Sequence, residues 1–383
     1  MPLKVIDTNS DSKIVLNKVE FKQEEGLRYF RVSNSENNNL GIDIQYIPNN
    51  ISDWDKERFE IFLFENPYLN AENDVFEVYE RSLNNERLGW IFPIAILESN
   101  EEDVVSIKNL NNYRHIAYQK ILELDLTISA NTSSNEWIRL SNIFGDIIIC
   151  LLHKDTIQKI NNFQFNKYIL SFYKDGYLLY SGSPKAKTTY DRIAFVENKR
   201  KNKRITIQPS KFDIKANDFT NSLFIEHLLQ SDHYLVRFIF LYQIIEYFID
   251  ELSEKQYSEH VENYKAKKIS KNDFRESINT SATERKLIND VFELTTVQKE
   301  LKDEFITDID FLFKDIDKIS DKKSFPDKIY NLRNLVTHNL RELTTKSDSL
   351  KKITEIFERI IVDLLINYKT KVEERENLND KFA

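Results

Sequence analysis

The amino-acid sequence predicts an α+β protein in which a β-rich N-terminal domain, residues 1–212, precedes an all-helical domain, residues 219–383. Two observations support this division. Before Pro209, apolar and polar residues alternate in short runs separated by turn residues, which is typical of strands. After Pro209, apolar residues recur at helical spacing over long runs with few breakers, which is typical of packed helices.

The N-terminal domain is expected to consist mainly of strands joined by turns. Three runs alternate clearly: Lys13–Phe21, Leu27–Val32 and Ile42–Ile47. Two pairs of runs predict hairpins: Lys167–Lys174 with Tyr177–Ser181 around Asp175-Gly176, and Ile193–Val196 with Ile205–Gln208 around a charged turn. Two segments fit a helix or a strand equally: Trp54–Phe62 and Asn142–Leu152.

The C-terminal domain is expected to be a bundle of helices. Six segments carry apolar residues at helical spacing: Asn221–Gln230, Tyr234–Glu254, Ala282–Leu294, Lys299–Asp317, Pro326–Leu343 and Leu350–Glu374. Pro326 and Asp327 stand where a first helical turn favours proline and an acidic residue.

The segment Pro326–Leu343 has two distinct faces on a helical wheel. Its predicted core stripe is Ile329, Leu332, Val336, Leu340 and Leu343. The opposite face carries Asn331, Asn334 and His338 at positions i, i+3 and i+7. Asparagine is a mediocre helix former, so helix stability does not explain this polar row, and it indicates a functional surface.

The segment Tyr234–Glu254 is apolar on nearly all sides, which predicts burial on two sides. In a small helical domain, one side would face the core and the other a second copy of the chain. Glu246 falls within an apolar stripe of this segment, where an unpaired carboxylate would be costly. We therefore expect Glu246 to be buried and either paired with Arg333 or hydrogen-bonded beside His338.

A short motif links these two helices to a known family. Arg333-Asn334-Leu335-Val336-Thr337-His338 matches the R-N-x-x-x-H form of the HEPN signature. The segments 234–248 and 329–338 also resemble the first long helix and the active-site helix of the ApeA-like HEPN group. The chain departs from toxin-type members, which continue H-x-Y, because here the residues are His338-Asn339-Leu340.

The resemblance implies a metal-independent endoribonuclease that acts as a homodimer in prokaryotic defence against phage or in growth arrest. It implies single-stranded RNA or a tRNA loop as substrate, while the N-terminal domain would sense a phage-derived trigger or partner protein, or restrain the activity. Arg333, His338 and Asn334 would be catalytic, and Glu246 and Asn331 would support them.

These residue types suit RNA cleavage. Histidine exchanges protons near neutral pH, and a guanidinium presents a planar pair of donors to phosphate oxygens. Asn334, one turn before His338, could hold the imidazole or the phosphate. Arg333 and His338 point about 140° apart on an ideal helix, so one straight helix does not aim both at one phosphate. Two facing copies of the helix would solve this difficulty.

Composition excludes several other classes. The 383 residues include 6 glycines and contain no phosphate-binding glycine loop, which disfavours a nucleotide-hydrolysing or Rossmann-type site. The single cysteine excludes an intramolecular disulfide and a cysteine-based zinc site. His227 and His233 lack a chelating helical spacing, so no metal site is expected, and no cofactor is expected either. No apolar signal or membrane span is visible, which predicts a cytoplasmic protein. The net charge of −8 confines any RNA contact to a local surface.

One basic run is a secondary candidate for RNA binding. Its residues are Lys199, Arg200, Lys201, Lys203 and Arg204. Such a run between two strands is more often a solvated turn than an RNA contact. Two other readings of the whole chain stay open: a catalytically silent HEPN scaffold in a defence complex, and a CRISPR-associated HEPN ribonuclease with a Rossmann-like N-terminal domain.

Overall fold

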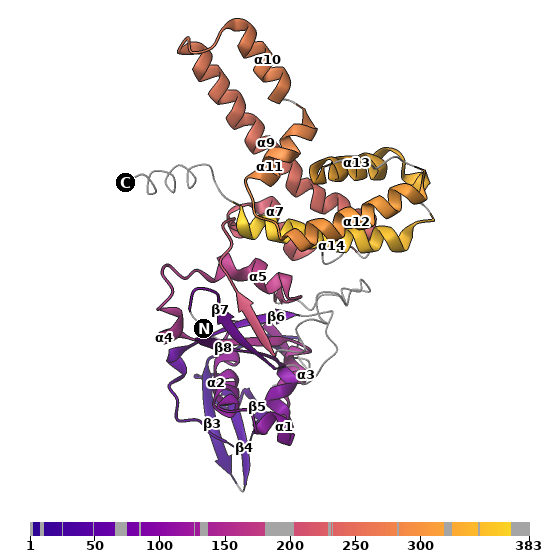
Figure 1. The fold of residues 1–383 in the computed structure, drawn as a ribbon. Helices are drawn as coiled ribbons and strands as arrows, with labels where there is room; N and C mark the ends of the chain where they lie inside the picture. The colour runs from indigo at the N-terminus through magenta and orange to yellow at the C-terminus, as the bar shows by residue number, and fades with distance from the viewer. Residues whose placement is uncertain are drawn as a thin grey trace. The chain divides into compact units, whose positions relative to one another are not determined.

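The computed structural model divides the chain into two compact units, with the change of unit between Gln208 and Pro209 (Figure 1). The first unit holds the described residues up to Phe165 and those from Ser171 to Gln208, and the second holds Asn166–Leu170 and the residues from Pro209 onward. The structure describes residues 3–7, 11–24, 26–48, 50–65, 75–83, 86–125, 127–130, 137–180, 203–228, 231, 233–281, 283–317, 324–343 and 345–368.

The first unit contains three sheets. A three-stranded sheet has the order β2 (Lys13–Leu16), β1 (Leu3–Asp7), β9 (Thr127–Ala130). A four-stranded sheet has the order β10 (Trp137–Ile138), β5 (Gly41–Gln45), β4 (Leu27–Ser33), β3 (Lys18–Glu24). A six-stranded sheet has the order β12 (Leu178–Leu179), β6 (Phe59–Glu65), β11 (Ile148–His153), β8 (Arg87–Pro93), β7 (Phe76–Glu80), β13 (Arg204–Ile207).

The mixed α+β class is confirmed, and the runs Leu27–Val32 and Ile42–Ile47 form β4 and β5 as predicted. The run Lys13–Phe21 is divided at Asn17 into β2 and β3, which belong to different sheets. Gly26, with a φ of +84°, provides the turn between β3 and β4. Gly89 in β8 is required for a different reason, because a Cβ atom there would lie 2.0 Å from the carbonyl oxygen of Leu151 in β11. Glycine thus allows the two central strands to approach closely.

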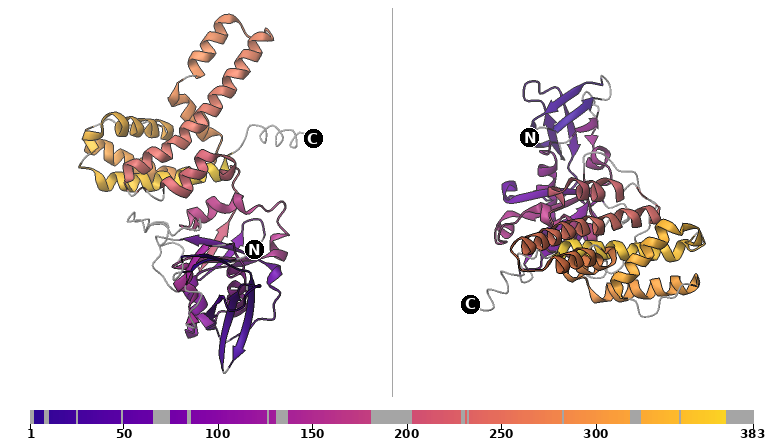
Figure 2. Two further views of the ribbon diagram at one scale, coloured as in Figure 1. Left: turned by 180° about the vertical axis from the view of Figure 1, so that it is seen from behind. Right: turned by 90° about the horizontal axis from the view of Figure 1, so that it is seen from above.

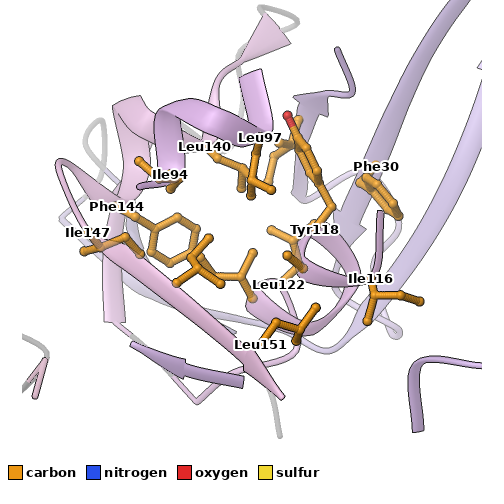
Figure 3. Close-up of a cluster of buried hydrophobic side chains, with 14 of the residues drawn as sticks. Phe30, Ile94, Leu97, Ile116, Tyr118, Leu122, Leu140, Phe144, Ile147 and Leu151 are labelled. Atoms are coloured by element: carbon orange, nitrogen blue, oxygen red, sulfur yellow. The ribbon is translucent and has the colours of Figure 1, made fainter. Parts of the chain in front are cut away.

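Helix α2 (Leu110–Ile121) supplies much of the core of the first unit. Its Tyr118, with Leu122 just beyond the helix, belongs to one buried cluster with Phe144 of α3 (Leu140–Phe144) and Leu151 of β11 (Figure 3). The cluster joins helices to the six-stranded sheet, which is the packing that fixes this unit.

The hairpin predicted around Asp175-Gly176 is wrong. The residues predicted as the strand 167–174 form a 3-10 turn, Phe165–Tyr168, followed by helix α5 (Ile169–Lys174). Gly176, at φ +83°, ends this helix, because the Tyr177 amide donates back to the Phe172 carbonyl. A glycine at positive φ serves a helix end as readily as a hairpin, so the Asp-Gly pair was ambiguous.

The second predicted hairpin is only partly described. Its second strand is present as β13, which pairs in parallel with β7, over one hundred residues earlier in the chain. The proposed partner strand 193–196 lies outside the described residues. The two ambiguous segments each resolve into both types: a 3-10 turn (Lys56–Arg58) precedes β6, and α3 precedes β11.

The second unit is helical throughout the part that the structure describes (Figure 2). Its longer elements are α7 (Asp218–Ser222), a π-helical turn (Leu223–His227), α9 (Tyr234–Lys265), α10 (Lys271–Ser281), α11 (Glu284–Glu293), α12 (Lys299–Asp315), α13 (Phe325–His338) and α14 (Ser347–Asn367). α9 is longer than predicted, and α10, which packs back on it through Tyr264 and Phe274, was not predicted.

A buried ion pair joins the two longest helices of this unit. Arg237 of α9 donates to Glu358 of α14 at 2.7 Å, and both side chains are at most 1% exposed. Arg237 also donates to the carbonyl groups of Leu228 and Ser231. Because charges buried without a partner are very costly, this set of bonds fixes how α9 lies against α14.

His115 of α2 is buried as a neutral imidazole in the first unit. The Tyr46 hydroxyl donates to the Asn50 carbonyl, so its oxygen accepts from Nδ1–H of His115 at 3.1 Å. Nε2 can then accept from the Gln119 amide at 3.3 Å. Burial lowers the pKa of His115 from its ordinary value to about 4.

The low pKa of His115 predicts acid sensitivity of the first unit. Between pH 6.5 and 4, His115 becomes protonated in the unfolded chain but stays neutral in the folded unit. The free energy of unfolding is therefore highest above pH 6.5 and falls as the pH drops. The loss should approach roughly 3 kcal/mol by pH 4. Urea unfolding at several pH values measures the loss, and the free energy of unfolding of His115→Gln should depend less on pH than that of the wild type. The same pH dependence in the two proteins would contradict the low pKa of His115.

Candidate active site

Helix α13 carries the predicted motif and is firmly defined at its start. Ser324 and Asp327 form a reciprocal capping box, and Pro326 occupies the first turn. The helix ends at His338, earlier than predicted. Leu340 therefore leaves the core stripe and is 47% exposed, whereas Ile329 and Leu332 are fully buried. The helix presents its remaining face to α9 and α11 and to solvent.

Arg333 lies among acidic and aromatic side chains from two other helices. Its Nη2 is 3.6 Å from Glu246 of α9, and its Nε is 3.8 Å from Glu284 of α11. The ring of Tyr242 lies 5.7 Å from the guanidinium carbon, and the Tyr242 hydroxyl donates to Glu284 at 2.8 Å. We call these four residues together with Asn334 the Arg333 cluster.

The ion pairs orient the guanidinium without using up its hydrogen-bonding capacity. Both distances exceed that of a hydrogen bond, and among the described residues Arg333 donates only to the Asn334 side chain, at 3.1 Å. A guanidinium has five N–H donors in a planar arrangement. The side chain is 25% exposed, so the unused donors remain accessible to a ligand.

Neither His338 nor the Asn331 amide is bonded to the Arg333 side chain. His338 is exposed, and its imidazole forms no hydrogen bond, ion pair or ring contact with a described residue. The Asn331 amide nitrogen is buried and donates to no described residue. Within one chain, the structure thus brings Arg333, Asn334 and Glu246 together, and it links neither His338 nor the Asn331 amide to them by a hydrogen bond or an ion pair.

The expected burial of Glu246 is wrong, although the carboxylate does lie beside Arg333. Its side chain is 44% exposed, because α9 turns that edge outward. The buried charge in this helix is instead Arg237, which the sequence showed only as an interruption of an apolar run. The apolar sequence around the charged residues of α9 thus predicted a buried charge in the correct helix, but the buried residue is Arg237 and not Glu246.

Two members of the cluster were not predicted. Tyr242 stands one helical turn before Glu246, so the i, i+4 spacing could have indicated it. Burial and the hydrogen bond to Glu284 raise the pKa of Tyr242, which keeps it a neutral donor. Glu284 begins α11, and no local pattern connects it with Arg333, because only the packing of α11 against α9 and α13 brings it there.

The basic run of the first unit is only partly described. Lys199, Arg200 and Lys201 lie outside the described residues. Lys203 precedes β13 at a positive φ of 46°, and the Arg204 guanidinium lies 3.4 Å from the ring centroid of Tyr79. Arg204 is therefore packed against its own sheet.

Comparison of the chain with family models, curated proteins and solved structures finds no match. Among the described helices, none has the length and apolar character needed to cross a membrane. In the same part of the chain, His, Cys, Asp and Glu side chains form no group of three or more suited to a metal ion.

The two arginine–glutamate pairs predict very different responses to the loss of the acid. Glu358→Ala should lower the free energy of unfolding by about 3–5 kcal/mol, because it leaves Arg237 buried and unpaired. Glu246→Ala should change it by about 1 kcal/mol or less, because that pair is solvent-exposed. Urea unfolding followed by helical circular dichroism measures both. Equal losses from the two variants would contradict this assignment of burial.

Proposed function

We propose that this protein is a metal-independent endoribonuclease whose active site is built from α13 of two identical chains. The observation that carries the proposal is the state of Arg333, which is held in place by Glu246 and Glu284 while most of its donors remain unused. The same helix ends in an exposed histidine without a described partner. The resemblance of these residues to the HEPN signature supports the same reaction.

The chemistry follows from the two side chains. The 2′-hydroxyl of the RNA attacks the adjacent phosphorus, forming a new O–P bond while the bond to the 5′-oxygen breaks. His338 accepts the proton of the 2′-hydroxyl or donates one to the departing 5′-oxygen. Arg333 stabilises the negative charge on the phosphate oxygens. The products carry 2′,3′-cyclic phosphate and 5′-hydroxyl ends, and unpaired RNA is favoured because in-line attack needs a flexible nucleotide.

A dimer explains how Arg333 and His338 meet. On one helix they diverge by about 140°, so His338 of one copy would complete the site around Arg333 of the other. α9 offers the surface for this association, because Val236 and Ile239 are 39% and 40% exposed on the outward face. Glu246 lies at the edge of that face, so the apolar surface adjoins the Arg333 cluster.

The biological role that the resemblance favours is cytoplasmic defence against phage or growth arrest. The first unit would then sense a phage-derived trigger or partner protein, or restrain the nuclease. Its six-stranded sheet is mostly antiparallel, which does not favour the Rossmann-like domain required by a CRISPR-associated ribonuclease.

A catalytically silent HEPN scaffold is the second candidate, and one observation favours it. Two carboxylates face a single guanidinium in the Arg333 cluster, so the local charge opposes phosphate binding. Activity measurements on variants separate the two functions.

Replacing the histidine tests the chemistry. His338→Ala should reduce the cleavage rate of single-stranded RNA by about 10²–10⁴, the usual contribution of a general acid or base. His260→Ala, which removes a histidine of α9 outside the cluster, is the matched control and should cleave normally. Cleavage should persist in excess EDTA, since protein side chains supply both the proton transfer and the phosphate contact. A fully active His338→Ala protein would refute the proposal.

Mixing two inactive variants tests the shared site. Arg333→Ala and His338→Ala should each be inactive alone. After subunit exchange, half of the dimers are mixed and each regains one intact site, so about a quarter of wild-type activity should return. Denaturing and refolding the two proteins together, with each variant alone as control, provides the measurement. No recovery despite dimers seen by light scattering would show that the two residues do not act across the interface in this way.

A further inference from the structure

A cavity of about 740 Å³ opens where α11 and α13 begin, next to the Arg333 cluster. Its polar lining includes Glu284, Arg285, Lys286, Asn289, Asp327 and Tyr330. The volume lies within the range of sites for small ligands and nucleotides, roughly 300–1,000 Å³. Glu284 belongs to both the cavity wall and the Arg333 cluster, so the two sites are contiguous.

One acidic side chain of the wall has a cation of its own. Asp327 is paired with Arg285 and bonded to Ser324, and these contacts lower its pKa to about 2. Glu284 accepts from Tyr242 and shares Arg333 with Glu246. Lys286 forms no ion pair with a described residue, so its charge is available to a phosphate. Both helices also begin here, which adds partial positive charge.

The cavity also offers groups suited to a nucleobase. The Tyr330 side chain is half-buried, lines the opening, and lies close enough to Arg285 to contribute to the raised pKa of that guanidinium. The Asn289 amide nitrogen donates to Glu293 at 2.6 Å, which leaves its carbonyl oxygen as an acceptor. An aromatic ring, an amide acceptor and a lysine form a set that can stack on a base, read its edge and contact its phosphate.

Along α13, the cavity residue Tyr330 is separated from Asn334 by about the length of one nucleotide. Tyr330, Asn334 and His338 follow one another at intervals of one turn on the same face of the helix. Each interval spans about 6 Å along the axis, similar to the reach of one nucleotide in a strand. A base in the cavity would place its neighbouring phosphate at the level of Asn334 and Arg333.

We infer that this cavity binds the nucleotide next to the scissile phosphate of a single-stranded RNA, with the base on Tyr330 and a phosphate at Lys286. This inference rests on the proposed ribonuclease function. A free nucleoside monophosphate shares the same recognition chemistry, so the experiment must separate a strand from a free nucleotide.

The test measures binding apart from cleavage. The probe is a short fluorescent RNA with 2′-fluoro sugars, which lacks the nucleophile and is not cut. In fluorescence anisotropy with the full-length protein, Tyr330→Ala should raise the Kd about 5- to 100-fold, the cost of losing one stacked base. Lys286→Ala should raise it several-fold and reduce the salt dependence of binding. Tyr257→Ala and Lys299→Ala, exposed residues away from the cavity, should bind as the wild type does.

Cleavage assays on the same variants identify which proposal fails. The expected result is a raised KM with little change in kcat for Lys286→Ala, an exposed position where folding is not at risk. If His338→Ala abolishes cleavage but Tyr330→Ala and Lys286→Ala bind and cleave normally, the cavity inference is overturned and the ribonuclease stands. If the wild type cuts no RNA, yet both variants lose binding, the nucleotide site stands and the ribonuclease proposal fails. If nucleoside 5′-monophosphates bind to the cavity and the RNA does not, the site serves a free nucleotide and the inference is overturned.

Discussion

The helical unit depends on the ion pair between Arg237 and Glu358, because among its described residues this is the ion pair in which both charged side chains are removed from water. Such a pair contributes little by itself but cannot tolerate displacement of either partner. It therefore fixes the rotation and position of α9 on α14. Tyr242 and Glu246 lie further along the rigid α9, so the same pair determines where they face α13.

Arg333 shows the opposite use of an arginine in the same unit. Arg237 is fully buried and forms a hydrogen-bonded ion pair with Glu358. Arg333 is partly exposed, and its two neighbouring carboxylates lie beyond hydrogen-bond distance. The two carboxylates keep the Arg333 guanidinium in one place by charge attraction and leave most of its N–H groups without a hydrogen bond. That combination is what a phosphate-binding group needs, since a fully bonded arginine would have nothing left to donate.

The cavity beside the Arg333 cluster lies along the first turns of α13. Asp327 is paired with Arg285 in the wall, and Lys286 and Tyr330 line the opening. One helix thus carries the cavity residue Tyr330 and, one turn further on, the phosphate-binding candidates Arg333 and Asn334. The second chain would contribute the histidine that the geometry of a single helix keeps away.

The sequence by itself determined features that depend on neighbouring residues: the helices of the second unit other than α10, the strands β4 and β5, and the polar face of α13. These could be predicted because helical hydrogen bonds and side-chain periodicity are local. It could not separate the helix 169–174 from a hairpin, since Asp175-Gly176 suits both. Only the tertiary structure decided that β13 pairs with β7, that Glu284 joins Arg333, and that Arg237 rather than Glu246 is buried. Burial and long-range pairing depend on which elements pack together, and that choice is made by the energy of the whole core rather than by any local pattern.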